Sequence, residues 1–394
     1  MTPAARAQAA IELLDQVIEA ARGGGAAADT LIARYFKDRR YAGSKDRRAV
    51  RELVYAAIRR CGERPTSGRA ALLGLADDLP DLLASFDGSP HGPVPPAANE
   101  IGSALSVVPA WLTSRFDPLI GEEEWPALLQ RAPLDLRTNR LKGTRELALA
   151  AFPNAVATLH SPIGLRLNDG SRVEEEAAWR SGLVEVQDEG SQLLALACEA
   201  RPSMLVVDLC AGAGGKTLAI AAEMANQGKI VASDTDRGRL SRMRPRMERA
   251  GVGIVEPRLL NPGAETAALA DLRAAADLVL VDAPCSGSGT WRRNPETRWR
   301  LTPDRLGRLV ALQAALLDIA AELVRPGGLL VYAVCSLFGE EGRDQAARFA
   351  ERRSAWVSEP VNMRAGRAAG FGRILAPGQD GTDGFFVARW RAPC

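Results

Sequence analysis

The chain has 394 residues, of which 46% are hydrophobic and 25% charged, and its formal net charge is +2. This is the composition of a soluble globular protein of two or three domains, and the total charge does not by itself indicate a nucleic-acid partner. No apolar run is long enough to span a membrane and the first residues lack a secretory signal, so we expect a cytoplasmic protein without a membrane partner.

Residues 1–125 predict a helical domain. Apolar residues recur at helical spacing from Ile11 to Ile18, a run of glycines follows, and two more amphipathic segments come next. A Pro- and Gly-rich stretch at 86–100 indicates a loop, and 107–116 predicts a further helix. Arginine clusters at 45–60, 236–251 and 291–300 suit contacts with RNA phosphates, although solvated helix faces are the alternative for any single cluster.

Residues 126–183 predict a small α+β domain, because segments that alternate like strands flank a helical one. From residue 184 to 394, strand and helix patterns alternate, which predicts a doubly wound parallel sheet. The strand candidates are 204–209, 229–234, 254–258, 278–283, 329–334 and 384–390. The last of them follows a long gap and is the one that could insert antiparallel.

A glycine-rich loop, "DLCAGAGGKT", follows the first of these strands. It misses the P-loop pattern at Cys210 and the dinucleotide-binding pattern at Thr217, each by one residue. Asp234 ends the next strand, where an acidic side chain can accept hydrogen bonds from a ribose. A ribose-bearing ligand without a pyrophosphate fits best, and S-adenosylmethionine is such a ligand. The alternative is a plain turn beside an exposed acid.

Two cysteines follow neighbouring predicted strands, Cys285 in "LVLVDAPCSGSGT" and Cys335 in "LLVYAVCS". The chain has six cysteines without a Cys-x-x-Cys pair and only two histidines, so we expect neither a metal site nor disulfides. Carbon 5 of a pyrimidine becomes nucleophilic when a thiolate adds to carbon 6, and a second group must then help to resolve the adduct. The two cysteines suit this chemistry. The alternative for either one is a small buried thiol.

With these motifs the chain resembles the Nop/Sun family of RNA cytosine-5 methyltransferases, and within that family the bacterial 16S rRNA enzymes. The resemblance is carried by "DLCAGAGGKT", "VDAPCSGSGTWRRNPETRW" and "VYAVCS", with "LDLRTN" and "VQDEGSQ" in support. "YFKDRRYAGSKDRRAVRELVY" resembles the opening helical domain of that family, which is NusB-like. The implied fold is a Rossmann-like class I methyltransferase domain preceded by an all-α NusB-like domain and a small α+β domain.

The resemblance also implies residue roles. Cys335 would be the nucleophile, Cys285 would help to release the product, and Asp282 and Lys216 would hold the cytosine site. DNA cytosine-5 methyltransferases use the Pro-Cys cysteine as nucleophile, so position alone leaves these roles exchangeable, and the RNA-type flanking motif decides the assignment. The implied cofactor residues are Cys210, Ala211, Gly212, Ala213, Gly214, Gly215, Lys216, Asp234, Arg239, Asn261 and Asp282.

Two residues depart from the family pattern. Asn261 stands where an acidic residue is usual near the adenine, and Val334 stands where Thr is usual before the nucleophile. We expect the first to alter cofactor affinity without abolishing binding. The expected protein is a monomeric RNA methyltransferase acting on 16S rRNA. The alternatives are the same chemistry on tRNA and a non-catalytic ribosome-assembly factor that has kept the fold.

Overall fold

A computed structural model describes residues 1–167 and 172–394. The chain forms two compact units, each built from separate segments. The helical unit comprises residues 1–116, 121–130 and 290–303, and the sheet unit comprises 117–120, 131–289 and 304–394. Within the described ranges, none of the helices has the length and apolar character needed to cross a bilayer.

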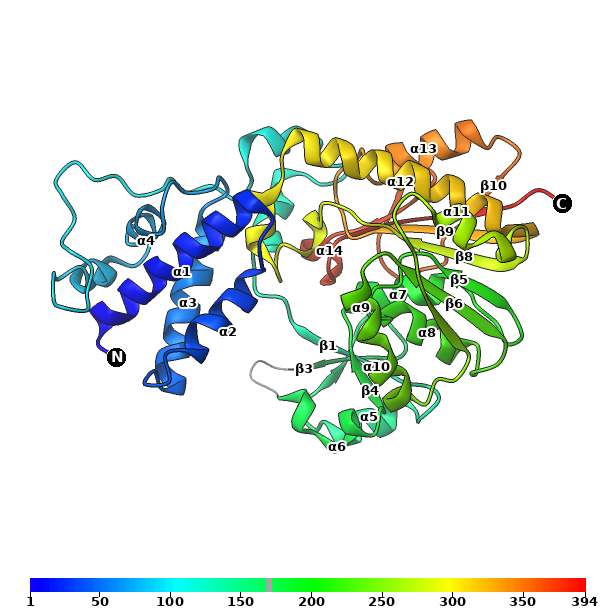
Figure 1. Cartoon of the computed structure of the whole chain (residues 1–394), viewed down its shortest axis with the longest axis horizontal. Coiled ribbons are helices and arrows are strands. Elements are labelled where there is room, and N and C mark those ends of the chain that lie inside the picture. Colours follow the sequence, from blue (N-terminus) through cyan, green and yellow to red (C-terminus); the bar gives the residue numbers. More distant parts are fainter. Residues whose placement is uncertain (168–171) are drawn as a thin grey trace. The chain divides into compact units, whose positions relative to one another are not determined.

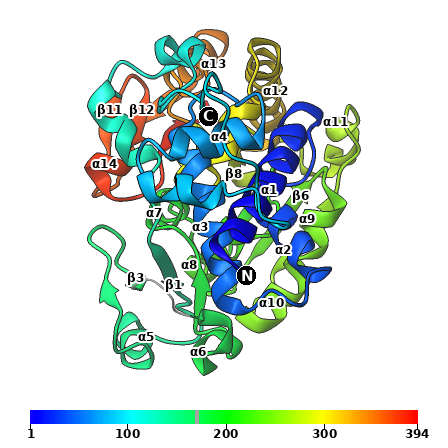
Figure 2. The ribbon, with the colours of Figure 1, turned by 90° about the vertical axis from the view of Figure 1, so that its left-hand side faces the viewer.

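The helical unit contains the three predicted N-terminal helices and a fourth. They are α1 (Pro3–Gly23), α2 (Ala28–Lys37), α3 (Ser44–Arg60) and α4 (Gly68–Leu75). The Thr2 side chain caps α1 by accepting a hydrogen bond from the backbone N–H of Ala5, and Gly24 ends the helix with φ 71°. Buried residues of α1, α3 and α4 share one core, and α1 runs along α3 (Figures 1 and 2). The predicted helix at 107–116 is a short 3₁₀ segment, Ala110–Arg115.

The segment 290–303, which follows the Pro-Cys loop in sequence, belongs to the helical unit. Its 3₁₀ turn, Pro295–Arg300, places Trp299, 3% exposed, in the core of that unit. The buried Arg298 guanidinium donates hydrogen bonds to the carbonyls of Ile58, Arg59 and Cys61 at the end of α3. Arg298 is therefore neither a phosphate contact nor part of a solvated helix face, and both interpretations of it from the sequence are wrong.

A small antiparallel sheet with the order β2-β3-β1-β4 opens the sheet unit. Its elements are β1 (Leu134–Thr138), α5 (Arg145–Ala151), β2 (Val156–Ala157), β3 (Gly164–Leu167), α6 (Ala177–Arg180) and β4 (Val184–Val186). The helices α5 and α6 pack against this sheet (Figure 2) and share a separate apolar core with it. The sheet therefore continues three residues beyond 183, the predicted end of the small domain.

The large sheet has the order β11-β12-β13-β9-β8-β5-β6-β7, with β10 paired to β13. Strands β5 to β9 are parallel, and β13 is antiparallel to β9. The strands are β5 (Leu205–Asp208), β6 (Lys229–Asp234), β7 (Val255–Leu259), β8 (Ala276–Asp282), β9 (Val324–Val334), β10 (Val357–Glu359), β11 (Arg367–Ala369), β12 (Gly372–Leu375) and β13 (Phe385–Arg391). This is the predicted Rossmann-like sheet, and its last strand does insert antiparallel.

Helices cover both faces of the large sheet. They are α7 (Glu189–Ala197), α8 (Gly215–Glu223), α9 (Arg237–Ser241), α10 (Met243–Ala250), α11 (Glu265–Ala268), α12 (Pro303–Leu323), α13 (Arg343–Arg352) and α14 (Pro377–Asp380). Figure 1 shows α12 and α13 along one face and α7 and α8 along the other. Successive strand residues such as Val206 and Val207 are both buried, because their side chains point to opposite faces of the sheet and each face is covered.

Candidate active site

The candidate site lies where the direction of the strand order reverses. β5 and β8 are adjacent at the centre of the parallel strands. β6 and β7 lie on the β5 side, and β9 lies on the β8 side. Loops after adjacent parallel strands diverge at such a point, and ligands bind in the crevice that results. The glycine-rich loop follows β5, the Pro-Cys loop follows β8, and Cys335 follows β9. All predicted catalytic residues therefore belong to one edge of one sheet.

The two predicted cysteines are in contact. β8 and β9 pair in register up to Asp282 and Ala333, and beyond that point the Sγ atoms of Cys285 and Cys335 lie 3.3 Å apart. Both side chains are partly exposed, so a ligand can reach them. The hydrogen bond to Cys335, together with burial, raises the pKa of Cys285 well above its ordinary value. Cys285 therefore carries its proton at neutral pH.

Lys216 and Asp282 form an ion pair beside the cysteines, with Nζ and Oδ2 2.7 Å apart. The Lys216 side chain is only 11% exposed, and its ammonium also lies over the ring of Phe385. Burial alone would lower the pKa of Lys216, but Asp282, followed by Cys335, raises it. Lys216 is thus a fixed positive charge next to both a carboxylate and the thiol pair.

The glycine-rich loop has the backbone geometry expected of a ligand cradle. Gly212 and Gly214 have φ values of +56° and +83°, which side-chain-bearing residues adopt rarely. A Cβ at Gly212 would collide with the guanidinium of Arg239. Arg239, another predicted cofactor residue, therefore lies against the loop. Asp234 accepts hydrogen bonds from the backbone N–H groups of Gly212 and Asp236, each at 2.7 Å. The acid predicted to bind the ribose therefore also fixes the loop.

The electrostatics of this loop favour a cationic ligand over a polyphosphate. Burial, followed by the nearby carboxylates of Asp208, Asp282 and Asp234, raises the pKa of Cys210 well above its ordinary value. Carboxylates around a ligand loop repel phosphates and attract a sulfonium. The donor set thus fits S-adenosylmethionine: open backbone amides at the start of α8, the Asp234 side chain after β6, and a Lys216 ammonium that is already paired with Asp282 rather than free to bind phosphates. It does not fit the nucleotide triphosphate that the near-match to a P-loop left open.

The remaining predicted residues lie as follows. Ala211 donates its backbone N–H to Ser233, and Gly214 donates to the carbonyl of Ala211, so these residues shape the loop turn. Asn261 is exposed in the loop after β7, and its carbonyl accepts a bond from Ala264. Val334 is fully buried in β9 opposite Phe386, so its methyl groups belong to the sheet core.

Two arginines that were not predicted as site residues hold the glycine-rich loop from outside. The fully buried Arg137, in the "LDLRTN" motif, donates to the carbonyl of Gly215 and to the side chain of Gln187. Arg246 donates to the carbonyl of Ala213 and pairs with Glu185. Burial lowers the pKa of Arg137 to about 9, so it stays charged at neutral pH. The "LDLRTN" motif was recognised in the sequence, but nothing in the sequence showed that Arg137 contacts the glycine-rich loop.

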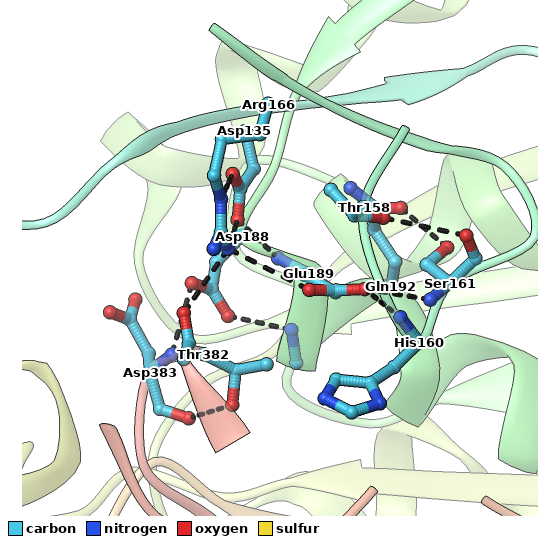
Figure 3. Close-up of polar contacts among 12 residues, drawn as sticks. Asp135, Thr158, His160, Ser161, Arg166, Asp188, Glu189, Gln192, Thr382 and Asp383 are labelled. Carbon is cyan, nitrogen blue, oxygen red and sulfur yellow. Dashed lines mark hydrogen bonds and ion pairs between the residues drawn. The ribbon is translucent and has the colours of Figure 1, made fainter. Parts of the chain in front are cut away.

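The two supporting motifs meet in a cluster that joins the small sheet to α7 (Figure 3). Arg166 of β3 forms a two-bond ion pair with Asp135 of β1 and also donates to the carbonyl of Gly381. Glu189 accepts the backbone N–H groups of His160 and Ser161, and Asp188 accepts that of Asp383. These acids therefore anchor chain segments within the sheet unit. Across residues 1–167 and 172–394, His, Cys, Asp and Glu form no cluster able to hold a metal ion.

Comparison with known proteins agrees with this geometry. A family model described as 16S rRNA methyltransferase RsmB/F matches residues 194–391. A Synechocystis protein named "Probable ribosomal RNA small subunit methyltransferase B" is 36% identical over 300 residues, which cover 71% of this chain and 66% of that protein. The Xanthomonas campestris ribosomal RNA small subunit methyltransferase B is 33% identical over 287 residues, 71% of this chain and 65% of its own length. The matches thus span slightly less than two thirds of these relatives.

Solved structures share the fold. A methyltransferase homolog protein from Pyrococcus horikoshii superposes with a TM-score of 0.60 at 27% identity, over 68% of this chain and 89% of its own. NSun6 from Pyrococcus horikoshii gives a TM-score of 0.63 at 21% identity, over 72% of this chain and 98% of its own. The protein PH0851 gives 0.77 at 22% identity and covers 99% of both chains.

Proposed function

Because the chain belongs to the RsmB/F family of 16S rRNA methyltransferases, we propose that it methylates carbon 5 of a cytosine in RNA. The proposed substrate is 16S rRNA and the proposed methyl donor is S-adenosylmethionine, which supplies an electrophilic methyl group. An rRNA substrate would place the protein in the cytoplasm. The N-terminal helical domain, proposed to be NusB-like, would add affinity for the RNA, and the protein would act as a monomer.

The proposed chemistry divides among four side chains. The Cys335 thiolate adds to carbon 6, and the electron pair released toward carbon 5 forms the new bond to the methyl group while the bond from that methyl group to the sulfur of its donor breaks. A base then removes the proton from carbon 5, the carbon 5–carbon 6 double bond reforms, and the Cys335 thiolate leaves. Cys285 assists this last stage. Asp282, held by Lys216, accepts hydrogen bonds from the donor edge of the cytosine.

One observation carries the proposal: two thiols from adjacent strands lie 3.3 Å apart beside a buried Lys–Asp pair and the glycine-rich loop. Carbons 5 and 6 of a pyrimidine are bonded neighbours, so the groups that act on them must also be neighbours. A target base must leave its helix to reach such a site. The tRNA alternative uses the same residues. A non-catalytic assembly factor would need none of these four side chains together.

The test is methylation of small-subunit rRNA by the purified protein, mapped by bisulfite sequencing, with rRNA isolated from cells that lack the gene. We expect one protected cytosine that is absent without the protein. Protection in tRNA alone would favour the tRNA alternative. Complete absence of methyl transfer to either RNA, with S-adenosylmethionine bound, would favour the assembly factor.

Separate substitution of the two cysteines tests their roles. Cys335→Ala should abolish methylation and any covalent RNA complex, because no thiolate attacks carbon 6. Cys285→Ala should still allow attack and methyl transfer, then stall, so that protein stays bound to RNA on a denaturing gel. A trapped complex with Cys335→Ala instead would reverse the roles. Full activity of both variants would reject the thiol mechanism.

A further inference from the structure

A buried carboxylate, Glu341, lies behind the two cysteines. It follows β9 in the loop before α13, six residues after Cys335, and its side chain is 0% exposed. It accepts hydrogen bonds from the backbone N–H and the hydroxyl of Ser286 and from the hydroxyl of Ser336, at 2.8 Å for the first and 2.6 Å for the last. Ser286 and Ser336 are the residues that directly follow Cys285 and Cys335.

The network extends on both sides of this carboxylate. Gln313 of α12 donates its amide to Glu341 at 3.0 Å and to the carbonyl of Pro284, the residue before Cys285, at 2.9 Å. The hydroxyl of Ser288 lies 3.0 Å from that of Ser336 and accepts the backbone N–H of Leu337. Both cysteine loops are therefore joined to one carboxylate through buried polar side chains.

This carboxylate is held by hydrogen bonds rather than by a counter-ion. In the described part of the chain, no Arg, Lys or His lies within ion-pair distance of Glu341. Burial raises the pKa of Glu341, and its bonds to Ser286, Ser336 and Gln313 oppose that rise. A buried charged group without such donors is strongly destabilising, so the four donors and the acid depend on one another.

The sheet alone does not fix the two loops relative to each other. The last paired residues of β8 and β9 are Asp282 and Ala333. One more backbone bond follows, from the N–H of Ala283 to the carbonyl of Ala333. Beyond that point, one cysteine loop is tied to the other by the backbone bond from Gly289 to Cys335, by direct contacts of Ser286 and Ser288 with Ser336 and Leu337, and by Glu341, which bonds both Ser286 and Ser336. Placement errors of about 1 Å at reacting groups cost on the order of 100-fold in rate.

We propose that Glu341 is a positioning residue that sets the separation and orientation of the Cys285 and Cys335 sulfurs, acting through Ser286 and Ser336. The expected effect on the methylation rate rests on the proposed cytosine-5 methylation. The effect on the placement of the two sulfurs does not depend on it. Glu341 touches no substrate. It acts because one acceptor group binds both loops at the residue next to each thiol.

Glu341→Gln is the test variant, because the amide keeps the size of the carboxylate but replaces one acceptor oxygen with a donor. The new amide N–H group would then face an N–H or O–H donor of the network, and that hydrogen bond would be lost. The matched control is Glu351→Gln, an exposed position on α13. We expect S-adenosylmethionine affinity and the KM for RNA to stay within twofold of wild type, and kcat to fall at least tenfold. The control should match wild type.

A second measurement is independent of RNA. Diamide oxidises two adjacent thiols to a disulfide and takes up both thiol hydrogens to become the hydrazine. We expect the Cys285–Cys335 disulfide, measured by peptide mass spectrometry, to form at least tenfold more slowly in Glu341→Gln. Alkylation of each thiol by iodoacetamide should change less than threefold, which separates positioning from exposure. If Glu341→Gln does not fold, Ser336→Ala replaces it with the same expectations, because it removes the bond to Glu341 together with the contacts of this hydroxyl to Ser286, Ser288 and Phe338.

The outcomes separate the two proposals. Wild-type disulfide rate and kcat in Glu341→Gln would overturn the positioning role and leave cytosine methylation intact. Slow disulfide formation in Glu341→Gln, in a protein whose wild type methylates no cytosine, would support the positioning role and reject the proposed function. Equal losses in the disulfide rate and in both alkylation rates would also overturn the positioning role, since they indicate a general loss of structure.

Discussion

At the scale of single residues, Asp208 is the acid whose titration the fold changes most clearly. It ends β5, is 1% exposed, and accepts the Thr217 hydroxyl at 2.6 Å. In the described residues no partner lies within hydrogen-bonding distance of its second oxygen, which suits a protonated carboxyl. Burial is the main cause that raises the pKa of Asp208 from 3.8 to about 7.

This shift predicts how stability depends on pH. Between pH 4 and pH 7 the unfolded chain loses the Asp208 proton while the folded chain keeps it, so this residue makes the protein less stable as pH rises. Each pKa unit corresponds to about 1.4 kcal/mol. Asp208→Asn keeps an acceptor for Thr217 and removes the titration. We therefore expect its Tm to exceed that of wild type by more at pH 8 than at pH 5. An equal difference at both pH values would contradict the shift.

Asp234 is the residue on which cofactor binding should depend most. One of its oxygens accepts the backbone N–H of Gly212 in the glycine-rich loop and the other that of Asp236, and the proposed ribose would be a further donor. Asp234→Ala should weaken S-adenosylmethionine binding by about 1–3 kcal/mol, measured by isothermal titration calorimetry. The control is Asp236→Asn, because Asp236 caps α9 and Asn caps equally well. Unchanged affinity in Asp234→Ala would mean that the ligand binds elsewhere.

At the scale of elements, the segment 290–303 is a structural part of the helical unit. Helix α3 ends with carbonyls that have no partner within the helix, and Arg298 supplies donors to three residues there. Trp299 donates its indole N–H to the carbonyl of Cys61 as well. Burial lowers the pKa of Arg298 to about 9, so it remains charged at pH 7.

Loss of this contact should destabilise the helical unit. Arg298→Ala would remove three hydrogen bonds to the end of α3, and we expect a loss of about 2–4 kcal/mol in the free energy of unfolding, followed by urea titration. Arg308→Ala, at an exposed position of α12, should change it by less than about 0.5 kcal/mol. Cofactor affinity should be the same in both variants, because the cofactor residues belong to the sheet unit. Equal stability of the two variants would show that the bonds of Arg298 contribute little.

At the scale of the whole molecule, the basic face of α3 is the proposed source of salt-dependent RNA affinity. Arg60 is not part of it, because it is buried and paired with Asp77 and Asp78. Lys45, Arg48 and Arg51 are exposed, and the pairs of Arg48 with Glu52 and of Arg51 with Asp29 are surface ion pairs, which contribute little and can give way to a phosphate. Deletion of residues 1–125 is a poor test of this role, since it would strip Trp299 of its core. Charge removal in the full chain avoids that problem.

The triple substitution Lys45→Gln, Arg48→Gln and Arg51→Gln should weaken RNA binding and reduce its salt dependence. Each lost phosphate contact lowers the slope of log K against log salt by about 0.7–0.9, so three contacts predict a change of about 2. Fluorescence anisotropy with an rRNA fragment at several salt concentrations measures both quantities. A triple variant at Arg308, Arg352 and Arg353 loses the same charge from the sheet unit. If both variants lose affinity equally, α3 has no special role.

The sequence by itself determined the fold class and which strand each candidate loop follows. Continuous Val and Leu runs become strands buried on both faces, so the six predicted strands could be read from hydrophobicity, whereas the short strands β10, β11 and β12 were not predicted. The placing of Cys285 and Cys335 at one edge also followed from sequence, because parallel strands of one sheet end on the same side and these two strands are neighbours. The antiparallel β13 was open in the sequence, since periodicity does not encode strand direction.

Only the tertiary structure decided which polar residues support the site and which segments belong together. Glu341 is one acid among many in the sequence, and only the packing of two loops gives it donors from Ser286 and Ser336. Arg298 lies in an Arg-rich run that looked basic and exposed, yet it is buried against the end of α3. The physical reason is the same in both cases. A polar side chain is specified by partners distant in the chain, and local sequence carries no record of them, whereas apolar periodicity is local.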